Sequence, residues 1–437
     1  MVKNIKVVIG ANYGDEGKGR VVDFFASNAI KKKKKAIVVC SNGGAQRGHT
    51  VVTDSGYQHI FHHFGSGTFA GADTYIPANF IVNPMIFMKE YELLEFCAPV
   101  IYINPACYVS TPFDMMNNQI IEQSRGDKRH GSCGVGIWET ILRNGATYSE
   151  MINMTDDQLF KYLENIRDRY SKNRLYKKNI LDLPEEWRKI YYNDEMIHHY
   201  IRDFRAMSDR TFGIAKLSND SILNFYDTII FENGQGMLLD EEYSKNNLYS
   251  TPSKTTLDIP MKIIKDTFDQ DNTNYFVEVC YVTRSYLTRH SLGEFREEKP
   301  ISEMGFICHN FETNINNKNQ GDFRYGLFSN TELFNLKTRI YHDFSTNTND
   351  INRRIDCSLA VTHLDEYDIP LDKIIKSKPL SNIITTVYRF YGRKSDDKVL
   401  TDWFPEMTLN ADLPNDIGFS LSYGKDGSIV IDYTIKE

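Results

Sequence analysis

Apolar residues are concentrated along the chain in short runs, at residues 5–9, 36–40, 227–232 and 276–282, with few polar residues inside them. Runs of this length that are rich in valine and isoleucine are typical of strands buried on both faces of a sheet. More polar segments separate these runs. The pattern predicts an α/β fold with a large, mainly parallel sheet, flanking helices, and helical and loop subdomains.

A glycine-rich turn follows the first apolar run, with Gly14, Gly17 and Gly19 close together. Glycine permits positive φ angles and close approach of the backbone. The apolar residues Val21, Val22, Phe24 and Phe25 are typical of a helix that begins behind the turn. The N–H groups at such a helix start bind phosphate well, and Lys18 adds a full positive charge. We therefore predict a P-loop-like phosphate site, although the spacing is shorter than the usual G-x-x-x-x-G-K-[ST].

Two carboxylates, Asp15 and Glu16, lie inside this turn. A carboxylate beside bound phosphate is unfavourable unless it holds a metal ion or moves a proton. Asp15 is therefore a candidate for catalytic chemistry.

The composition is that of an ordinary globular protein. Of 437 residues, 41% are hydrophobic and 25% are charged, and the formal net charge is −7. The one basic run, at residues 31–35, is short, so we expect no surface that binds nucleic acid.

Seven cysteines are scattered without any C-x-x-C pair, which favours a reducing compartment and argues against disulfides or a zinc site. The N-terminus enters the first strand at once and leaves no room for a signal peptide. No apolar run is long enough to span a membrane. We therefore expect a cytoplasmic enzyme that does not bind membranes.

Four ordered motifs carry a resemblance to a known family. Residues 14–19 read G-D-E-G-K-G and residues 43–50 read G-G-A-Q-R-G-H-T. They resemble adenylosuccinate synthetase, whose pattern is G-D-E-G-K-G followed by G-G-x-N-A-G-H-T. Residues 231–240 and 288–295 resemble two later motifs of this family, F-E-G-A-Q-G-x-x-L-D and T-R-V-G-x-G-P-F.

The resemblance implies one synthetase-like domain over residues 1–437. The segment at about residues 149–214 is strongly charged and helical in pattern, and we expect it to form a peripheral helical excursion.

The resemblance also implies a reaction. It is that of a ligase that joins L-aspartate to C6 of a 6-oxopurine nucleoside monophosphate, using GTP or ATP and Mg²⁺. Asp15 would take the N1 proton while O6 attacks the γ-phosphate, and the amine of aspartate would then displace phosphate from the 6-phosphoryl intermediate to give adenylosuccinate. His49 would donate a hydrogen bond or a proton to the transferring phosphoryl group. Asp15 and the Gly48 carbonyl would contact the metal ion.

The binding residues implied by the resemblance fall into three groups. The substrate nucleotide would contact Glu16, Gly17, Lys18, Gln46, Ser132, Cys133, Arg143, Gln235 and Thr251. The donor triphosphate would contact Gly14, Gly17, Lys18, Gly19, Gly48, Thr50, His363, Asp365, Ser422 and Gly424. Aspartate would contact Gln320, Arg324 and Arg289. Arg143 would reach the monophosphate of a neighbouring subunit, which implies a homodimer.

Several departures from the family pattern leave alternatives open. His363 replaces the lysine of T-K-L-D, so the donor can be GTP or ATP. Gln46 and the altered loop at residues 320–326 resemble viral members that make 2-aminoadenylosuccinate from (deoxy)guanylate, whereas retention of Asp15 favours IMP. A nucleotide-binding regulator without catalysis and an unrelated P-loop phosphotransferase are the remaining hypotheses.

Overall fold

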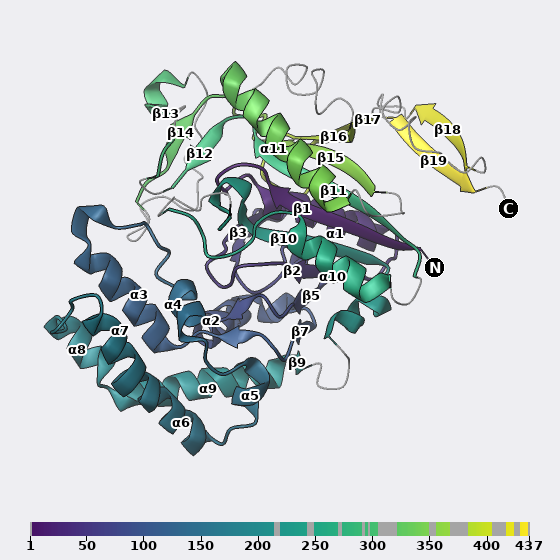
Figure 1. Ribbon diagram of the computed structural model, residues 1–437. Coiled ribbons are helices and arrows are strands. Elements are labelled where there is room, and N and C mark those ends of the chain that lie inside the picture. Colours follow the sequence, from purple (N-terminus) through teal and green to yellow (C-terminus); the bar gives the residue numbers. More distant parts are fainter. Residues whose placement is uncertain are drawn as a thin grey trace.

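A ten-stranded sheet forms the centre of the protein (Figure 1). The structure is a computed structural model that describes residues 2–213, 219–242, 249–269, 273–290, 293–295, 298–304, 321–348, 355–367, 383–403, 417–423 and 429–435. From one edge to the other, the strands are β17 (Val399–Trp403), β16 (Ile384–Phe390), β15 (Ile355–Thr362), β11 (Tyr275–Arg284), β1 (Lys3–Gly10), β10 (Thr228–Gly236), β2 (Ala36–Cys40), β5 (Asp73–Ile76), β7 (Ile101–Ile103) and β9 (Phe212–Gly213). All neighbouring strands run parallel except β16 and β17. The predicted fold class is confirmed.

Successive residues of β1 point to opposite faces of the sheet, and each face has its own helical layer. Val8 packs in a cluster with α1 (Lys18–Lys31). Val7 and Ile9 belong to the cluster that includes α10 (Asp258–Phe268) and α11 (Asn330–Thr348) on the other face. This two-sided burial explains why the strand has three consecutive apolar residues near its end, Val7 to Ile9, rather than an alternating pattern.

A second hydrophobic core lies beside the sheet and is built mainly from helices (Figure 1). Its helices are α2 (Pro84–Leu94), α3 (Pro112–Ser124), α5 (Tyr148–Ile152), α6 (Asp156–Asn165), a π-helical turn (Ile166–Ser171), α7 (Lys172–Tyr176), α8 (Glu185–Tyr191) and α9 (Asp194–Arg210), with the short α4 (Ile137–Arg143) beside them. The segment expected to be a helical excursion thus carries α5 to α9.

Four small sheets complete the described structure. They consist of β3 (His49–Val52) with β4 (Gln58–Phe61), β6 (Ile81–Val82) with β8 (Tyr108–Val109), β12 (Leu287–Arg289) with β13 (Glu298–Lys299) and β14 (Arg324–Gly326), and β18 (Ile417–Tyr423) with β19 (Ile429–Ile435). Within the described ranges, no helix is both long and apolar enough to cross a bilayer.

The central strands end at one edge of the sheet. Because β1, β10, β11 and β15 are parallel neighbours, their last residues, Gly10, Gly236, Arg284 and Thr362, lie at the same edge. The carboxyl edge of an open parallel sheet is where ligands bind in doubly wound folds. The glycine-rich turn leaves β1 at this edge.

Candidate active site

The turn after β1 is closed by a carboxylate of its own. Glu16 accepts hydrogen bonds from the backbone N–H of Asn12 at 3.0 Å and of Gly14 at 2.8 Å, and it pairs with Lys18 Nζ at 2.6 Å. Burial would raise the pKa of Glu16, but Lys18 and the N–H donors hold this pKa below its usual value. Glu16 therefore shapes the turn and orients Lys18, whereas the structure does not place it in the cavity wall.

Neighbouring strands hold the turn from outside. Arg284, the last residue of β11, donates from Nε to the carbonyl of Asp15 at 2.6 Å. Thr362, the last residue of β15, donates to the carbonyl of Glu16 at 2.8 Å. Asp15 adopts a positive φ of 58° in this arrangement, a conformation that costs energy for a non-glycine residue and must be held by its surroundings.

The side chain of Asp15 points into a cavity and keeps 29% of its surface exposed. Its Oδ2 lies 3.7 Å from Nε2 of His290. Burial raises the pKa of Asp15, and the nearby His290 and Arg284 oppose this shift. A carboxylate with a raised pKa is suited to accept a proton from a substrate.

His49 is held by a buried carboxylate. Its Nδ1 lies 2.7 Å from Oε1 of Glu232, and its Nε2 lies 3.1 Å from the carbonyl oxygen of Gly234. Glu232 also accepts from Arg47 Nη2 at 3.0 Å and from the N–H of Ser66 at 3.1 Å. Burial would raise the pKa of Glu232, but Arg47 and His49 hold it well below its usual range.

Both ring nitrogens of His49 thus lie against acceptors, an arrangement that suits an N–H at each position. Burial lowers the pKa of His49, and the Glu232 carboxylate opposes this shift. The ring is fixed in orientation and can give up a proton readily. It therefore has the properties of a hydrogen-bond donor or acid at a reacting phosphoryl group.

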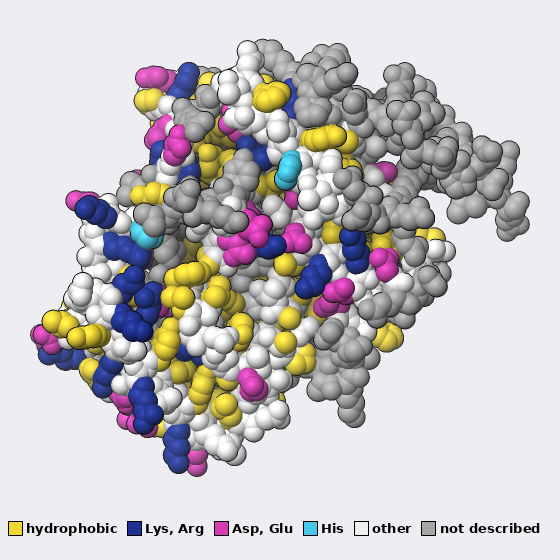
Figure 2. All heavy atoms as spheres, viewed as in Figure 1, with side chains coloured by type: hydrophobic (Ala, Val, Ile, Leu, Met, Phe, Trp, Pro, Cys, Tyr) yellow, Lys and Arg dark blue, Asp and Glu magenta, His cyan; other side chains and the backbone are white. Residues whose placement is uncertain are grey.

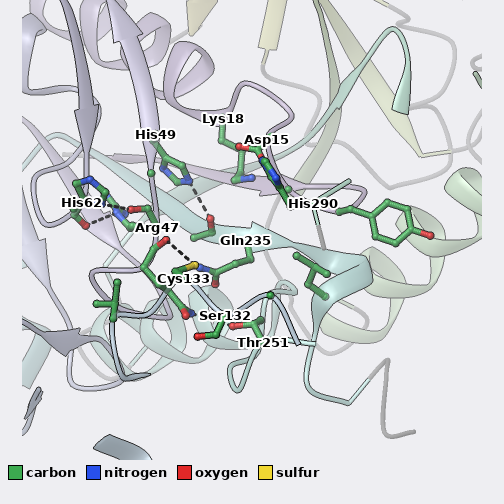
Figure 3. A pocket seen from close by; sticks show the side chains of 18 of the residues that line it. Asp15, Lys18, Arg47, His49, His62, Ser132, Cys133, Gln235, Thr251 and His290 are labelled. Atoms are coloured by element: carbon green, nitrogen blue, oxygen red, sulfur yellow. Dashed lines mark hydrogen bonds and ion pairs between the residues drawn. The ribbon is translucent and has the colours of Figure 1, made fainter. Parts of the chain in front are cut away.

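One cavity of about 1030 Å³ connects most of the predicted residues (Figure 3). Those in its wall are Gly14, Asp15, Gly17, Lys18, Gly19, Gln46, Gly48, His49, Thr50, Ser132, Cys133, Gln235, Thr251, His363 and Asp365. Figure 3 shows Asp15 and Lys18 beside His290, whereas Ser132, Cys133 and Thr251 lie together in another part of the cavity. The structure brings these residues together, and their individual roles stay predictions.

Polar side chains meet in the part of the cavity near Thr251. Gln46 donates from Nε2 to the hydroxyl of Thr251 at 3.0 Å, and Oε1 of Gln235 is buried without a hydrogen-bond partner among the described residues. Burial, together with the charge of Asp15, raises the pKa of Cys133 to about 11. Cys133 is therefore a neutral thiol at pH 7 and not a nucleophilic thiolate.

The residues predicted to bind the donor base follow β15. His363 has a positive φ of 59°, and its Nδ1 lies 2.8 Å from the hydroxyl of Thr362. Asp365 is exposed and lines the cavity. Gly424 and the side chain of Ser422 lie outside the residues that the structure describes.

The residues predicted to bind aspartate are not brought together in the cavity wall. Arg324 forms a two-pronged ion pair with Glu298, with Nε 3.0 Å from Oε1 and Nη2 close to Oε2. The guanidinium of Arg289 lies over the ring of Tyr13 at 4.5 Å. Gln320 lies outside the described residues.

Arg143 also lies away from the cavity wall. Its guanidinium is paired with Asp114 within the same chain. The role across a subunit interface that the resemblance implies for Arg143 stays a prediction.

Sequence reasoning missed several residues that the structure adds to the site. His290, which follows the T-R motif directly, occupies the position where the family pattern has valine, and it lines the cavity. Arg284 also lines the cavity; the sequence places it at the end of a buried run but gives it no role. Glu232 lies in a strand that the sequence predicts only as buried. A glutamate in such a strand was the available signal, because a buried carboxylate requires a partner.

The residues present fit a Mg²⁺ ion that is bound partly by the protein and partly by substrate phosphates, rather than one bound by the protein alone. In the part of the chain that the structure describes, no three His, Cys, Asp or Glu side chains form a metal-binding group. Mg²⁺ typically binds one or two carboxylates and completes its shell with water and substrate phosphates. Asp15 and Gly48 both line the cavity and offer oxygen ligands.

A parallel α/β sheet with a phosphate-binding turn at its carboxyl edge, and an acidic residue and a histidine in one cavity, define a nucleotide-binding enzyme of the α/β class. The chain belongs to the adenylosuccinate synthetase family, whose sequence model matches residues 7–322. This family consists of ligases that form a C–N bond.

Curated relatives carry the same name. The adenylosuccinate synthetase of Chlorobium chlorochromatii is 26% identical over 77% of both chains, and that of Pelodictyon phaeoclathratiforme is 24% identical over 92% of this chain and 90% of the relative. The match to the Borrelia turicatae enzyme is 28% identical and covers 60% of this chain and 60% of the relative. This chain therefore spans about three fifths of that relative.

Two solved structures share the fold. Fully ligated adenylosuccinate synthetase from Plasmodium falciparum matches with a TM-score of 0.58 and 18% identity, over 92% of this chain and 88% of that chain. Cyanophage S-2L succinoaminodeoxyadenylate synthetase, bound to dGMP and dATP, matches with a TM-score of 0.55 and 15% identity, over 93% of this chain and 96% of that chain.

Proposed function

We propose that the protein joins L-aspartate to C6 of a 6-oxopurine nucleoside monophosphate, with IMP as the favoured substrate and GTP or ATP as the phosphoryl donor. The product from IMP is adenylosuccinate. The observation that carries the proposal is that Asp15 and His49 line one cavity together with the phosphate turn. The family membership supports the reaction class.

The chemistry assigns one task to each of these two residues. Asp15 accepts the N1 proton, so that negative charge develops on O6, which attacks the γ-phosphorus while the nucleoside diphosphate leaves. His49 donates to the transferring phosphoryl group, and Glu232 holds its ring in place. The amine of aspartate then attacks C6, phosphate leaves with its bonding electron pair, and the amine loses a proton.

Asp15 and the Gly48 carbonyl would hold Mg²⁺ together with the donor phosphates, and the bound ion would neutralise charge at the phosphoryl group. Lys18, oriented by Glu16, adds a second positive charge at the same phosphates.

A direct assay tests the proposal. The purified protein is mixed with IMP, aspartate, Mg²⁺ and either GTP or ATP, and phosphate and adenylosuccinate are measured. Aspartate-dependent turnover supports the proposal. Phosphate transfer that does not depend on aspartate would indicate an unrelated phosphotransferase, and nucleotide binding without turnover would indicate a regulator.

A second candidate substrate is (d)GMP, with 2-aminoadenylosuccinate as the product. Gln46, which replaces the asparagine of the usual pattern, contacts Thr251 in the cavity and supports this alternative, as does the cyanophage enzyme whose structure holds dGMP and dATP. Asp15 is retained and supports IMP. Comparing kcat/KM for IMP, dIMP, GMP and dGMP, each with ATP and with GTP, decides between them.

The homodimer implied by the resemblance is also proposed here. A mass measurement in solution across a range of protein concentrations tests it.

A further inference from the structure

A histidine that the family pattern lacks lies next to the proposed proton acceptor. Nε2 of His290 is 3.7 Å from Oδ2 of Asp15, and both residues line the cavity. The family pattern has valine at position 290. Valine offers only methyl groups to a ligand, whereas a neutral imidazole offers one N–H donor and one nitrogen acceptor. The histidine therefore adds hydrogen-bonding capacity at the edge of the reacting site.

Strand pairing fixes the place of the His290 ring. In the antiparallel pair of β12 and β14, Arg289 lies opposite Arg324, so His290 and Phe323 are the next residues outward on the two strands. The rings of His290 and Phe323 are in contact, with centroids 3.9 Å apart and planes inclined by 37°. Both side chains are buried, with 8% and 9% of their surface exposed. Packing thus restricts the orientation of the imidazole.

The ring that supports His290 is also tied to the phosphate turn. The guanidinium of Arg284 lies 5.7 Å from the centroid of the Phe323 ring, and Nε of Arg284 donates to the carbonyl of Asp15. Arg284 therefore contacts both the backbone of Asp15 and the ring that packs on His290. This arrangement sets the separation of the Asp15 carboxylate and the imidazole.

The space between the carboxylate and the imidazole suits an amino group. A separation of 3.7 Å between Oδ2 of Asp15 and Nε2 of His290 is longer than a hydrogen bond. A third nitrogen can lie about 2.9 Å from both atoms, and an amino group has a hydrogen for each. Nε2 accepts when the proton of the neutral ring is on Nδ1.

The roles proposed for Asp15 and His49 decide which edge of the base reaches His290. Asp15 accepts the proton of N1, the ring atom between C2 and C6. O6, on C6, is turned toward the phosphoryl group that His49 contacts. Figure 3 shows His49 and His290 on opposite sides of Asp15. The C2 side of the base therefore faces His290.

C2 is the position at which the two candidate substrates differ. IMP has a hydrogen there, whereas GMP has an amino group, which weakens binding if it is buried without an acceptor. Surface charge does not distinguish the two nucleotides. Lys and Arg side chains gather over the helical region that contains α3 and α7 (Figure 2), and such a surface attracts both monophosphates alike. Discrimination has to come from contacts with the base.

We propose that His290 is a specificity-determining residue that recognises the substituent at C2, and that it accepts a hydrogen bond from the 2-amino group of (d)GMP. This inference rests on the proposed function. Asp15 accepts from N1 and, through Oδ2, from the other hydrogen of the amino group. His290 thereby raises the preference for (d)GMP over (d)IMP relative to a site with valine at this position.

Steady-state kinetics on the full-length protein test the proposal. kcat/KM is measured for IMP, GMP, dIMP and dGMP at saturating aspartate and donor, and the ratios of GMP to IMP and of dGMP to dIMP are compared. His290→Val should lower both ratios by at least about tenfold, because the amino group loses an acceptor. Unchanged ratios would overturn the proposal. So would a change only between ribose and deoxyribose, or a wild-type protein that excludes both guanine nucleotides.

Further variants separate the acceptor from the ring. His290→Phe keeps an aromatic ring against Phe323 without an acceptor and should lower the ratios as His290→Val does. His290→Gln supplies an amide oxygen and should recover part of the loss. His130→Val makes the same exchange at another histidine of the cavity wall and should leave the ratios unchanged. Circular dichroism checks folding, and His290→Phe decides the question if His290→Val does not fold.

The two levels of inference fail differently. If the wild-type protein turns over none of the four nucleotides, the proposed function itself is wrong. The dissociation constants of GMP and IMP, measured by calorimetry, then test His290 through the same ratio. If the wild type is active and the ratios stay constant in His290→Val, only the assignment of His290 is wrong.

Discussion

Nδ1 of His49 lies 2.7 Å from Oε1 of Glu232, and both side chains are buried. The two residues come from different elements, since His49 begins β3 and Glu232 lies within β10. The pair joins the G-H-T motif to the central sheet. It therefore fixes the orientation of the His49 ring relative to the central sheet.

His49→Asn should lower kcat by about a hundredfold without abolishing nucleotide binding, because it removes the donor that we propose for the phosphoryl group. Glu232→Gln should lower kcat as well, since it frees the ring. It should also lower the free energy of unfolding, because Arg47 would then be a buried charge without its partner.

The double variant that combines His49→Asn with Glu232→Gln tests whether Glu232 affects kcat by orienting His49 or only by stabilising the fold. If Glu232 acts through His49, the losses in kcat should be far from additive in the pair. The measurement is a double-mutant cycle on kcat beside urea denaturation of each variant. Additive losses in kcat would show that Glu232 does not work through His49.

Asp15→Asn should keep the fold and much of the nucleotide affinity while it removes the proposed proton acceptor. Turnover should fall by at least about a hundredfold, the usual contribution of a general base. Steady-state kinetics and calorimetry on the same preparation separate the two effects. Retained turnover in Asp15→Asn would be incompatible with the role given to Asp15.

The fold was predictable because its central strands are buried on both faces. The apolar run at residues 36–40 coincides with β2, and the run at 276–282 lies within β11. The turn behind β1 was also predictable, since its glycines and Lys18 are adjacent in the chain. The sequence pattern was sufficient to predict the strands, whose burial repeats along the chain, and the turn, whose residues are adjacent in the sequence.

The charge pairs were not predictable in the same way. Arg143 pairs with Asp114, which lies 29 residues away in the sequence, and Arg324 pairs with Glu298, which lies 26 residues away. Nothing in the spacing of these residues selects one partner over another. His290 was missed because it replaces an apolar residue of the motif. Which arginines are free for a ligand depends on three-dimensional pairing.

The pairing of Arg324 with Glu298 allows a prediction of how two substitutions change the KM for aspartate. If Arg324 binds aspartate, the Glu298 carboxylate competes for the same guanidinium, and Arg324 lowers the pKa of Glu298. Glu298→Gln should then lower the KM for aspartate, and Arg324→Gln should raise it by about tenfold or more. KM is measured at saturating nucleotide concentrations.

The control for this pair is the KM for the nucleotide substrates, which should not change in either variant. If both variants keep the wild-type KM for aspartate, Arg324 is an ordinary structural partner of Glu298 and not a substrate ligand.

The buried carboxyl group of Asp343, in α11, predicts how the free energy of unfolding depends on pH. Burial raises the pKa of Asp343 to about 6, although the hydroxyl of Tyr281 and the N–H of Leu257 donate to this carboxylate at 2.8 and 3.2 Å. Because the folded-state pKa is above the unfolded value, the folded state favours the protonated carboxyl. The stabilisation is complete below about pH 4 and is lost as the pH rises through about 6.

Asp343→Asn should remove this dependence, since an amide does not titrate. The free energy of unfolding of Asp343→Asn relative to wild type should therefore rise between pH 4 and pH 8, by up to about 3 kcal/mol, because each pKa unit corresponds to about 1.4 kcal/mol. Urea denaturation at several pH values measures the difference. Tyr281→Phe removes a donor that favours the charged carboxylate, so it should steepen the wild-type loss of stability over the same pH range. A difference between Asp343→Asn and wild type that is constant with pH would contradict the raised pKa of Asp343.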